Sequence, residues 1–206
     1  MKKLLIPSTA AIGLMACAVD ASAVSSAVSS AKPTSTSTAN AVSVPIYSDR
    51  CISEKEVVAA QKAWGDGIVK IGAVFSSGGD YEEAASDHID QFYAYDLSLV
   101  LFKPTLASVE QFRASFDGAL SYFIGDNPSY PEDKGFALRP WTKVRWQNAG
   151  IVNNSCNMAV AMGNYFFTPA SGEPETKVEY TIAYIKDPEG DLKILVHQSS
   201  LPYSGT

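Results

Sequence analysis

The spacing of apolar residues changes near residue 126, and this change limits the fold more than any other feature of the chain. Before it, apolar residues recur every three or four positions, as they do on amphipathic helices. After it come four stretches rich in Val, Ile, Tyr, Phe and Thr, separated by short turn-forming clusters: residues 141–152, 158–168, 176–186 and 192–201. Four consecutive strands with short connections predict an antiparallel meander. Helices that precede such a sheet indicate an α+β fold with the helices on one face.

Two helices are expected at the start of the helical region. Ser53 and Glu56 form a capping box, in which each side chain can bind the backbone N–H of the other residue, so a helix should begin there. Its apolar face includes Trp64, which we expect in the core, and the helix should stop at Gly78-Gly79. Asp80 can then cap a second, shorter helix.

An extended stretch and a third helix follow. The extended stretch covers residues 99–103, and Pro104 breaks it. Thr105 or Ser108 can cap a helix that ends at residue 125 and carries apolar residues at helical spacing: Val109, Phe112, Phe116, Leu120 and Phe123. A strongly curved sheet folded over three N-terminal helices forms a cone with an open end, where pockets often lie.

The start of the chain has the composition of an export signal. A basic start and a short, interrupted apolar run over residues 4–19 predict a signal peptide at residues 1–23, cleaved after Ala23. An alternative cut lies before Cys17, where Leu14-Met15-Ala16-Cys17 resembles a bacterial lipobox and would make the protein a lipoprotein anchored at Cys17. We therefore expect an exported protein, periplasmic or secreted, with no transmembrane segment.

Three further segments follow the signal peptide. Residues 24–50 are rich in Ser, Thr, Ala and Val without a sustained apolar period, which is typical of a flexible linker. The folded domain is expected at residues 51–203, and residues 204–206 form a short tail. This arrangement leaves one domain, large enough to bury a single core.

Cys51 and Cys156 are the two cysteines outside the expected signal peptide. Two thiols in an oxidising compartment are more often joined than free, so we predict a disulfide between them. The alternative is a pair of buried, unpaired thiols. A bridge that closes a loop of about 100 residues stabilises by roughly 4–5 kcal/mol in the chain-entropy model. It would pin the first helix to the sheet.

Charge and motifs exclude several classes of function. The formal charge of −6 disfavours nucleic acid and anionic membranes as partners, because the surface repels phosphate groups. The sequence contains no glycine-rich phosphate loop, no Gly-x-Ser-x-Gly elbow and no His-Glu-x-x-His helix, which argues against nucleophilic and zinc-dependent hydrolases. We predict neither a metal site nor a cofactor.

The order of these elements resembles the nuclear transport factor 2-like superfamily, which includes SnoaL-like cyclases, ketosteroid isomerase and the association domain of calcium/calmodulin-dependent protein kinase II. Residues 194–202 resemble the final strand of the family, a hydrophobic run followed by histidine and Ser-Ser, and residues 155–168 resemble the cysteine-bearing middle strand of exported members. Cys51 and Cys156 match the two cysteine positions of those members. The resemblance covers residues 51–203.

The resemblance implies a cystatin-like α+β roll, in which a cone-shaped, strongly curved antiparallel sheet packs on three N-terminal helices. It also implies a homodimer, because members of the superfamily commonly pair through the sheet. Residues 102–105 and 179–181 additionally resemble exported bacterial proteins known as phosphoribosyl-AMP cyclohydrolases. That chemistry needs a metal-bound water and a cluster of Asp and Cys ligands, which this sequence lacks.

His197 is the strongest candidate for chemistry. It lies on the last strand, and the resemblance implies that this end of the strand is near the cone. It could act as a general acid or base, or donate a hydrogen bond to a ligand. The alternative is a strand histidine that a carbonyl or a dimer partner satisfies. His88, beside Asp87 and Asp90 on the short helix, is expected to be solvated or capping.

Six further residues are candidates for the wall of the cone. They share an expected position near the pocket or on one face of the strands: Tyr95, Asp96, Trp146, Asn164, Tyr180 and Tyr184. Asp96 could equally be a turn aspartate, and the aromatic residues could fill the cone and leave no cavity.

Two hypotheses for function follow from these residues. The first is an exported binding or assembly module of the SnoaL-like type, a homodimer that presents its cone to a small apolar or amphipathic ligand. The second is a cofactor-independent isomerase, cyclase or hydrolase that uses His197 in the cone.

Overall fold

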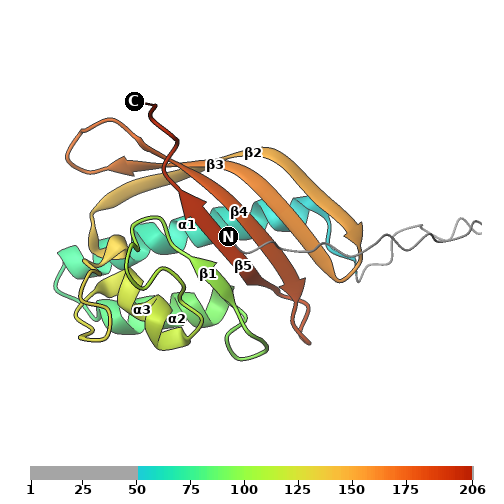
Figure 1. Cartoon of the computed structure of the whole chain (residues 1–206), viewed down its shortest axis with the longest axis horizontal. Coiled ribbons are helices and arrows are strands. Elements are labelled where there is room, and N and C mark those ends of the chain that lie inside the picture. Colours follow the sequence, from blue (N-terminus) through green and yellow to red (C-terminus); the bar gives the residue numbers. More distant parts are fainter. Residues whose placement is uncertain (1–50, 206) are drawn as a thin grey trace, which may run out of the picture. The chain divides into compact units, whose positions relative to one another are not determined.

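The computed structural model describes residues 51–205 (Figure 1), so the expected signal peptide, linker and lipobox at Cys17 lie outside the described residues. The elements follow in the order α1 (Glu54–Ser76), α2 (Tyr81–Phe92), β1 (Leu101–Lys103), α3 (Phe116–Ile124), the 3-10 helix η1 (Phe136–Leu138), β2 (Trp141–Ser155), β3 (Met158–Pro169), β4 (Thr176–Lys186) and β5 (Leu192–Ser200). Within this part of the chain, no helix has the length and apolar character needed to cross a membrane.

The sheet has five strands in the order β1-β5-β4-β3-β2. Strands β2 to β5 form the predicted antiparallel meander, and the short β1 joins β5 in parallel, which makes the whole sheet mixed. The sheet curves, and the helices lie on one side of it (Figure 1). The α+β cone expected from the sequence is therefore confirmed.

Helices α1 and α2 begin where their caps predict. The Ser53 hydroxyl accepts a bond from the N–H of Glu56 at 3.2 Å, and the Glu56 carboxylate accepts one from the N–H of Ser53 at 2.7 Å. The Asp80 carboxylate accepts from the N–H of Glu83 at 2.9 Å and caps α2. These bonds satisfy amides that have no partner within the helix.

The third helix begins later than predicted, because residues 104–115 are not helical. The Glu132 carboxylate accepts bonds from the backbone N–H groups of Ser108, Val109 and Glu110 at 2.8 to 3.2 Å. These amides therefore have a partner outside any helix. The cap of α3 is Ser115, whose hydroxyl accepts from the N–H of Gly118 at 3.1 Å.

The predicted disulfide between Cys51 and Cys156 is confirmed. Cys51 lies just before α1, and Cys156 lies in the turn between β2 and β3, so the bridge ties the first helix to the sheet. The N–H of Ile52 also donates to the carbonyl of Cys156 at 3.3 Å. The two bonds together fix this end of α1.

A β-bulge in β5 decides which of its side chains face the helices. Ala183 pairs with Val196, but Tyr184 pairs with Ile194, so Leu195 is an extra residue in β5. Alternation along a regular strand would place Val196 on the same face as Ile194. The bulge places His197 there instead, and both Ile194 and His197 are buried.

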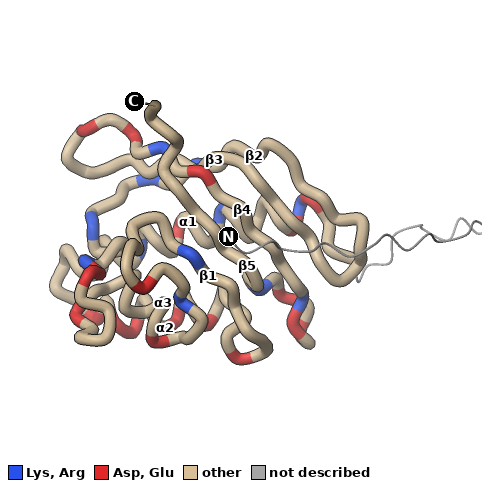
Figure 2. The backbone as a smooth tube through the Cα atoms, in the orientation of Figure 1, with Lys and Arg blue, Asp and Glu red and all other residues tan. Residues whose placement is uncertain are grey.

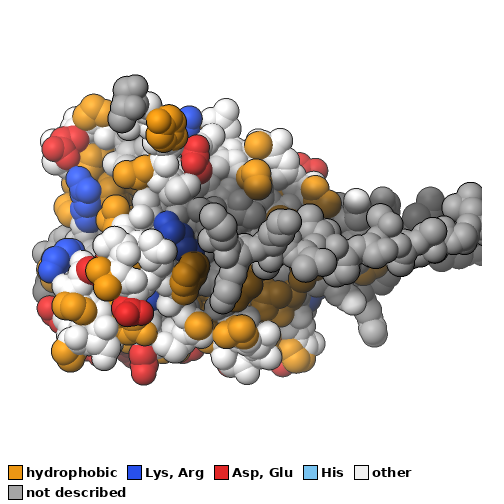
Figure 3. Space-filling model, viewed as in Figure 1, with side chains coloured by type: hydrophobic (Ala, Val, Ile, Leu, Met, Phe, Trp, Pro, Cys, Tyr) orange, Lys and Arg blue, Asp and Glu red, His pale blue; other side chains and the backbone are white. Residues whose placement is uncertain are grey.

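The surface is acidic around the helices. Asp and Glu gather over α2, α3 and the loops beside them in Figure 2. Exposed apolar side chains are dispersed among polar ones on the face seen in Figure 3. A small anion that approaches this side of the protein would meet a repulsive field unless local cations oppose it.

Candidate active site

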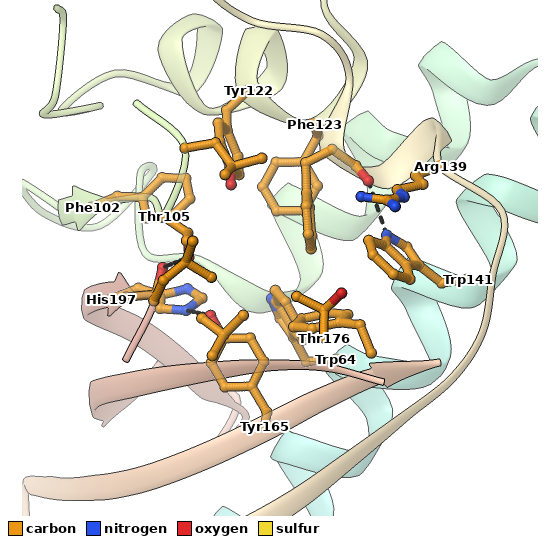
Figure 4. A pocket seen from close by; sticks show the side chains of 16 residues that line it. Trp64, Phe102, Thr105, Tyr122, Phe123, Arg139, Trp141, Tyr165, Thr176 and His197 are labelled. Carbon is orange, nitrogen blue, oxygen red and sulfur yellow. Dashed lines mark hydrogen bonds between the residues drawn. The ribbon is translucent and has the colours of Figure 1, made fainter. Parts of the chain in front are cut away.

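A cavity of about 220 Å³ lies between the helices and the inner face of the sheet (Figure 4). Most of its wall is apolar, and aromatic rings dominate that wall: Trp64, Phe102, Tyr122, Phe123, Phe136, Trp141, Tyr165 and Phe167. The polar lining consists of Thr105, Thr176, Ser199, His197 and Arg139 together with the two tyrosine hydroxyls. An apolar chamber with a few placed polar groups is the usual form of a small-molecule site.

Four polar side chains form a connected group on one side of this cavity. The Thr105 hydroxyl donates to the Ser199 hydroxyl at 2.8 Å, and the Tyr165 hydroxyl lies 3.4 Å from Nε2 of His197. Burial raises the pKa of the Tyr165 hydroxyl above its usual range, and the nearby Ser199 and Thr105 hydroxyls oppose part of this rise. Thr105 follows β1, while Ser199 and His197 lie two residues apart on β5 and so share a face.

His197 is buried and neutral. Its ring stacks on Phe102 with a centroid distance of 5.2 Å and meets Trp64 edge-on at 5.6 Å. Burial lowers the pKa of His197 from 6.5 to about 3, because the charged imidazolium would lose its hydration. At neutral pH the ring therefore carries one N–H donor and one acceptor nitrogen.

Tyr122 and Arg139 complete the polar lining. The Tyr122 hydroxyl points into the cavity (Figure 4), and burial raises its pKa well above the usual range. Arg139 is the one charged side chain among the described residues that line the cavity. It lies across the cavity from Thr105 and His197 (Figure 4), with its guanidinium 4.9 Å from the centre of the Trp141 ring.

Comparison with known proteins identifies the family. The model of the metal-independent carbonic anhydrase family matches residues 55–201. The chain belongs to this family. The match includes every residue that lines the cavity, from Trp64 to Leu201.

Individual relatives agree with this assignment. A metal-independent carbonic anhydrase from Nostoc sp. (strain PCC 7120) is 46% identical over 158 residues, which cover 75% of this chain and 76% of that protein. The crystal structure of a cyanobacterial iota-carbonic anhydrase complexed with bicarbonate is 44% identical, has a TM-score of 0.73, and is matched over 77% of this chain and 98% of its own. An NTF-2 like protein of unknown function from Shewanella oneidensis MR-1 is 13% identical, with a TM-score of 0.44 over 71% of this chain and 97% of its own. The α+β architecture that the nuclear transport factor 2-like resemblance implied is the one that this chain adopts.

Among the residues expected at the site, His197 lines the cavity of this carbonic anhydrase family member. Trp146, Tyr180 and Tyr184 do not line it. Trp146 and Tyr180 instead pack beyond Tyr165 and fill part of the cone, and Tyr184 is buried in the core. The Trp146 ring lies 4.9 Å from the Tyr165 ring and 5.0 Å from the Tyr180 ring. The cone is thus partly filled and partly open, a combination of the two outcomes that the sequence left undecided.

The other three expected residues lie away from the cavity. Asn164 pairs with Glu179 on the opposite face of the sheet from Tyr180, because Tyr180 pairs with Gly163. Tyr95 is half-buried and donates from its hydroxyl to the carbonyl of Arg113 at 2.8 Å. Asp96 is exposed in a turn, the alternative that the sequence allowed.

The expectation of a solvated or capping His88 is wrong. His88 is buried and packs against Phe92 at 4.8 Å, Phe123 at 5.6 Å and Trp64 at 5.7 Å between ring centres. Burial lowers its pKa from 6.5 to about 3. Gly67 of α1 leaves the space for the ring, since a Cβ atom there would lie 2.2 Å from Nδ1 of His88.

The sequence reasoning missed most of the polar site. Ser199 could have been found, because it lies two residues from His197 on one strand. Thr105 and Tyr165 meet them only through strand pairing and the chain path after β1, which local spacing does not report. Within residues 51–205, no group of three or more His, Cys, Asp or Glu side chains is placed to hold a metal ion.

Proposed function

We propose that this protein catalyses the reversible hydration of carbon dioxide to bicarbonate in the cavity, without a bound metal. The observation that carries the proposal is the family match over every residue that lines the cavity. A relative that is 44% identical was crystallised with bicarbonate. The proposal favours the second hypothesis from the sequence, a cofactor-independent enzyme, and replaces isomerase, cyclase or hydrolase chemistry with addition of water to carbon dioxide.

The lining suits both forms of the substrate. Carbon dioxide has no net charge or dipole, so the aromatic wall can hold it without loss of hydration. Bicarbonate is an anion with three oxygen atoms. The hydroxyls of Ser199 and Tyr165, which are hydrogen-bonded to Thr105 and His197, offer donors on one side of the cavity. Donors that are fixed before the reaction stabilise charge as it develops on oxygen.

The chemical step needs no covalent intermediate. The oxygen of a water molecule bonds to the carbon of carbon dioxide, one C=O electron pair moves onto oxygen, and the water loses a proton. The polar group orients the water and stabilises the new negative charge. His197 is not the proton acceptor at neutral pH, because its pKa of about 3 makes it a weak base in the unliganded cavity. The proton therefore leaves with solvent water.

Replacement of Ser199 by Ala is expected to lower the rate of carbon dioxide hydration by about 10- to 100-fold, since a hydrogen bond to a charged group contributes ~1.5–3 kcal/mol. The matched control is Ser200→Ala. Ser200 is the next residue, and its hydroxyl donates to Glu179 at 3.1 Å on the outer face. Stopped-flow hydration with a pH indicator measures both. If Ser199→Ala hydrated carbon dioxide at the wild-type rate, the Ser199 hydroxyl would have no part in the mechanism.

Replacement of Arg139 by Gln is expected to weaken bicarbonate binding about two- to fivefold, because an exposed charge contributes ~0.2–1 kcal/mol. The equilibrium constant links the two directions, so kcat/KM for hydration and dehydration must fall by the same factor. Arg145→Gln is the control, since Arg145 pairs with Glu175 at 2.7 Å and does not line the cavity. Equal KM for bicarbonate in all three proteins would rule out the role of Arg139.

The homodimer and the exported location stay predictions. The described residues show a disulfide and no membrane-spanning helix, which are compatible with export. Pairing of two chains through the outer face of the sheet is supported by exposed apolar side chains there, such as Val152 and Met162, which are 58% and 56% exposed.

A further inference from the structure

A buried chain of hydrogen bonds runs from Trp64 through Tyr93 to Nδ1 of His197. It begins at Trp64 on α1, whose Nε1 lies 3.2 Å from the hydroxyl oxygen of Tyr93. Both side chains are buried. An indole N–H can only donate, so the Tyr93 oxygen must accept this bond.

The hydroxyl proton of Tyr93 then needs an acceptor of its own. Among residues 51–205, the other hydrogen-bond partner of its hydroxyl is Nδ1 of His197, at 2.9 Å. The aromatic rings of Tyr95, Phe102 and Phe123 also pack against the Tyr93 ring. Burial also raises the pKa of Tyr93 well above its usual range, so the phenol keeps its proton. The proton therefore points at Nδ1.

The opposite arrangement would cost free energy. If Nδ1 of His197 carried the proton and donated to Tyr93, the Tyr93 oxygen would accept two bonds, and its own O–H would be buried without an acceptor among the described residues. A buried donor without a partner loses its hydration and gains nothing in exchange.

We propose that Trp64 and Tyr93 hold His197 in the tautomer with its proton on Nε2, so that the imidazole faces the cavity as a donor. Nε2 lies 3.4 Å from the Tyr165 hydroxyl oxygen, which accepts this bond. The Tyr165 proton is then free to point into the cavity. The four groups form one directed chain, from the indole N–H to a phenol proton at the substrate position, in which each bond polarises the next.

Tyr93 is thus a positioning residue that acts through His197 and does not line the cavity. The assignment deepens the proposed function, because it makes the polar group a set of donors to bicarbonate. The tautomer itself does not depend on that function. A spectroscopic measurement can therefore test the tautomer of His197 independently of the proposed activity.

The test is nitrogen-15 NMR of the uniformly labelled full chain at pH 7, with two-bond correlations from ring protons to ring nitrogens. The sequence contains two histidines, so the spectrum holds two imidazoles, and a His88→Leu variant assigns them. We expect Nδ1 of His197 to show the shift of an unprotonated nitrogen and Nε2 that of a protonated one. A protonated Nδ1 in the wild-type protein would overturn the proposal, whether or not any variant folds.

Tyr93→Phe supplies the second measurement. It removes the hydroxyl and keeps the ring, so we expect His197 to become a mixture of tautomers and hydration to fall by about 3- to 10-fold. Tyr95→Phe is the matched control, because its ring stacks on Tyr93 at 5.9 Å and its hydroxyl bonds to Arg113. An unchanged tautomer in Tyr93→Phe would contradict the proposal. The expected tautomer in a wild-type protein without hydration activity would contradict the proposed function alone.

Discussion

The free energy of unfolding is expected to fall by about 4 kcal/mol between pH 7 and pH 5, because two buried histidines must stay neutral in the folded protein. Burial lowers the pKa of both His88 and His197 from 6.5 to about 3. Between these values the unfolded chain binds more protons than the folded one, so stability falls as the pH drops. Each histidine contributes a slope of about 1.4 kcal/mol per pH unit below 6.5.

Urea titrations at the two pH values measure this change. Glu56 has a pKa lowered to about 2 in the folded protein, so its contribution is lost only below its ordinary value of 4.5 and does not interfere above pH 5. His88→Leu should halve the slope. It should also cost little at pH 7, since neither ring nitrogen of His88 has a hydrogen-bond partner in the described structure. Equal stability at pH 5 and pH 7 would show that the rings are solvated.

Removal of the disulfide is expected to lower the free energy of unfolding by about 4–5 kcal/mol, because the bridge closes a loop of 105 residues in the unfolded chain. For a domain of this size the melting temperature should fall by about 10–20 °C. The double variant Cys51→Ser/Cys156→Ser, followed by circular dichroism on heating, measures the change.

Reduced wild-type protein is the control for this variant and should melt at the same temperature. Neither cysteine lines the cavity, so carbon dioxide hydration well below the melting temperature should stay at the wild-type level. A melting temperature within about 2 °C of the oxidised protein would mean that the backbone bond from Ile52 to Cys156 is enough to hold the junction.

The elements that local signals define could be predicted from the sequence. The capping box at Ser53 and Glu56 is complete within four residues, and the first helix begins there. Strand β4 has the predicted bounds, 176–186, because turn-forming clusters flank it on both sides. Such signals need no knowledge of the rest of the fold.

Elements that depend on distant partners could not be predicted. Apolar residues at helical spacing suggested a helix through Val109 and Phe112, but both side chains are more than 70% exposed. The carboxylate of Glu132, more than 20 residues away, accepts hydrogen bonds from the backbone N–H groups of Val109 and Glu110. In a helix these groups would lie within the chain's own hydrogen-bonding pattern. Tertiary bonding here outweighs local propensity.

The site shows the same limit on a smaller scale. Alternation along a single strand correctly groups Ser199 with His197. Alternation within one strand does not report which residues of the next strand share its face. The sequence therefore predicts Asn164 and Tyr180 on one face, although the register pairs Tyr180 with Gly163 and so places Asn164 on the other face. The bulge at Leu195 cannot be read from alternation either, and it decides the direction of His197.

The most direct test of the central claim is exchange of oxygen-18 between labelled carbon dioxide and water, followed by mass spectrometry with the full chain after treatment with a chelator. We predict loss of label well above the rate with an inert protein, with no change on chelation and a large reduction in Ser199→Ala. Exchange equal to the uncatalysed rate in a folded, oxidised sample would contradict the proposal that this cavity hydrates carbon dioxide.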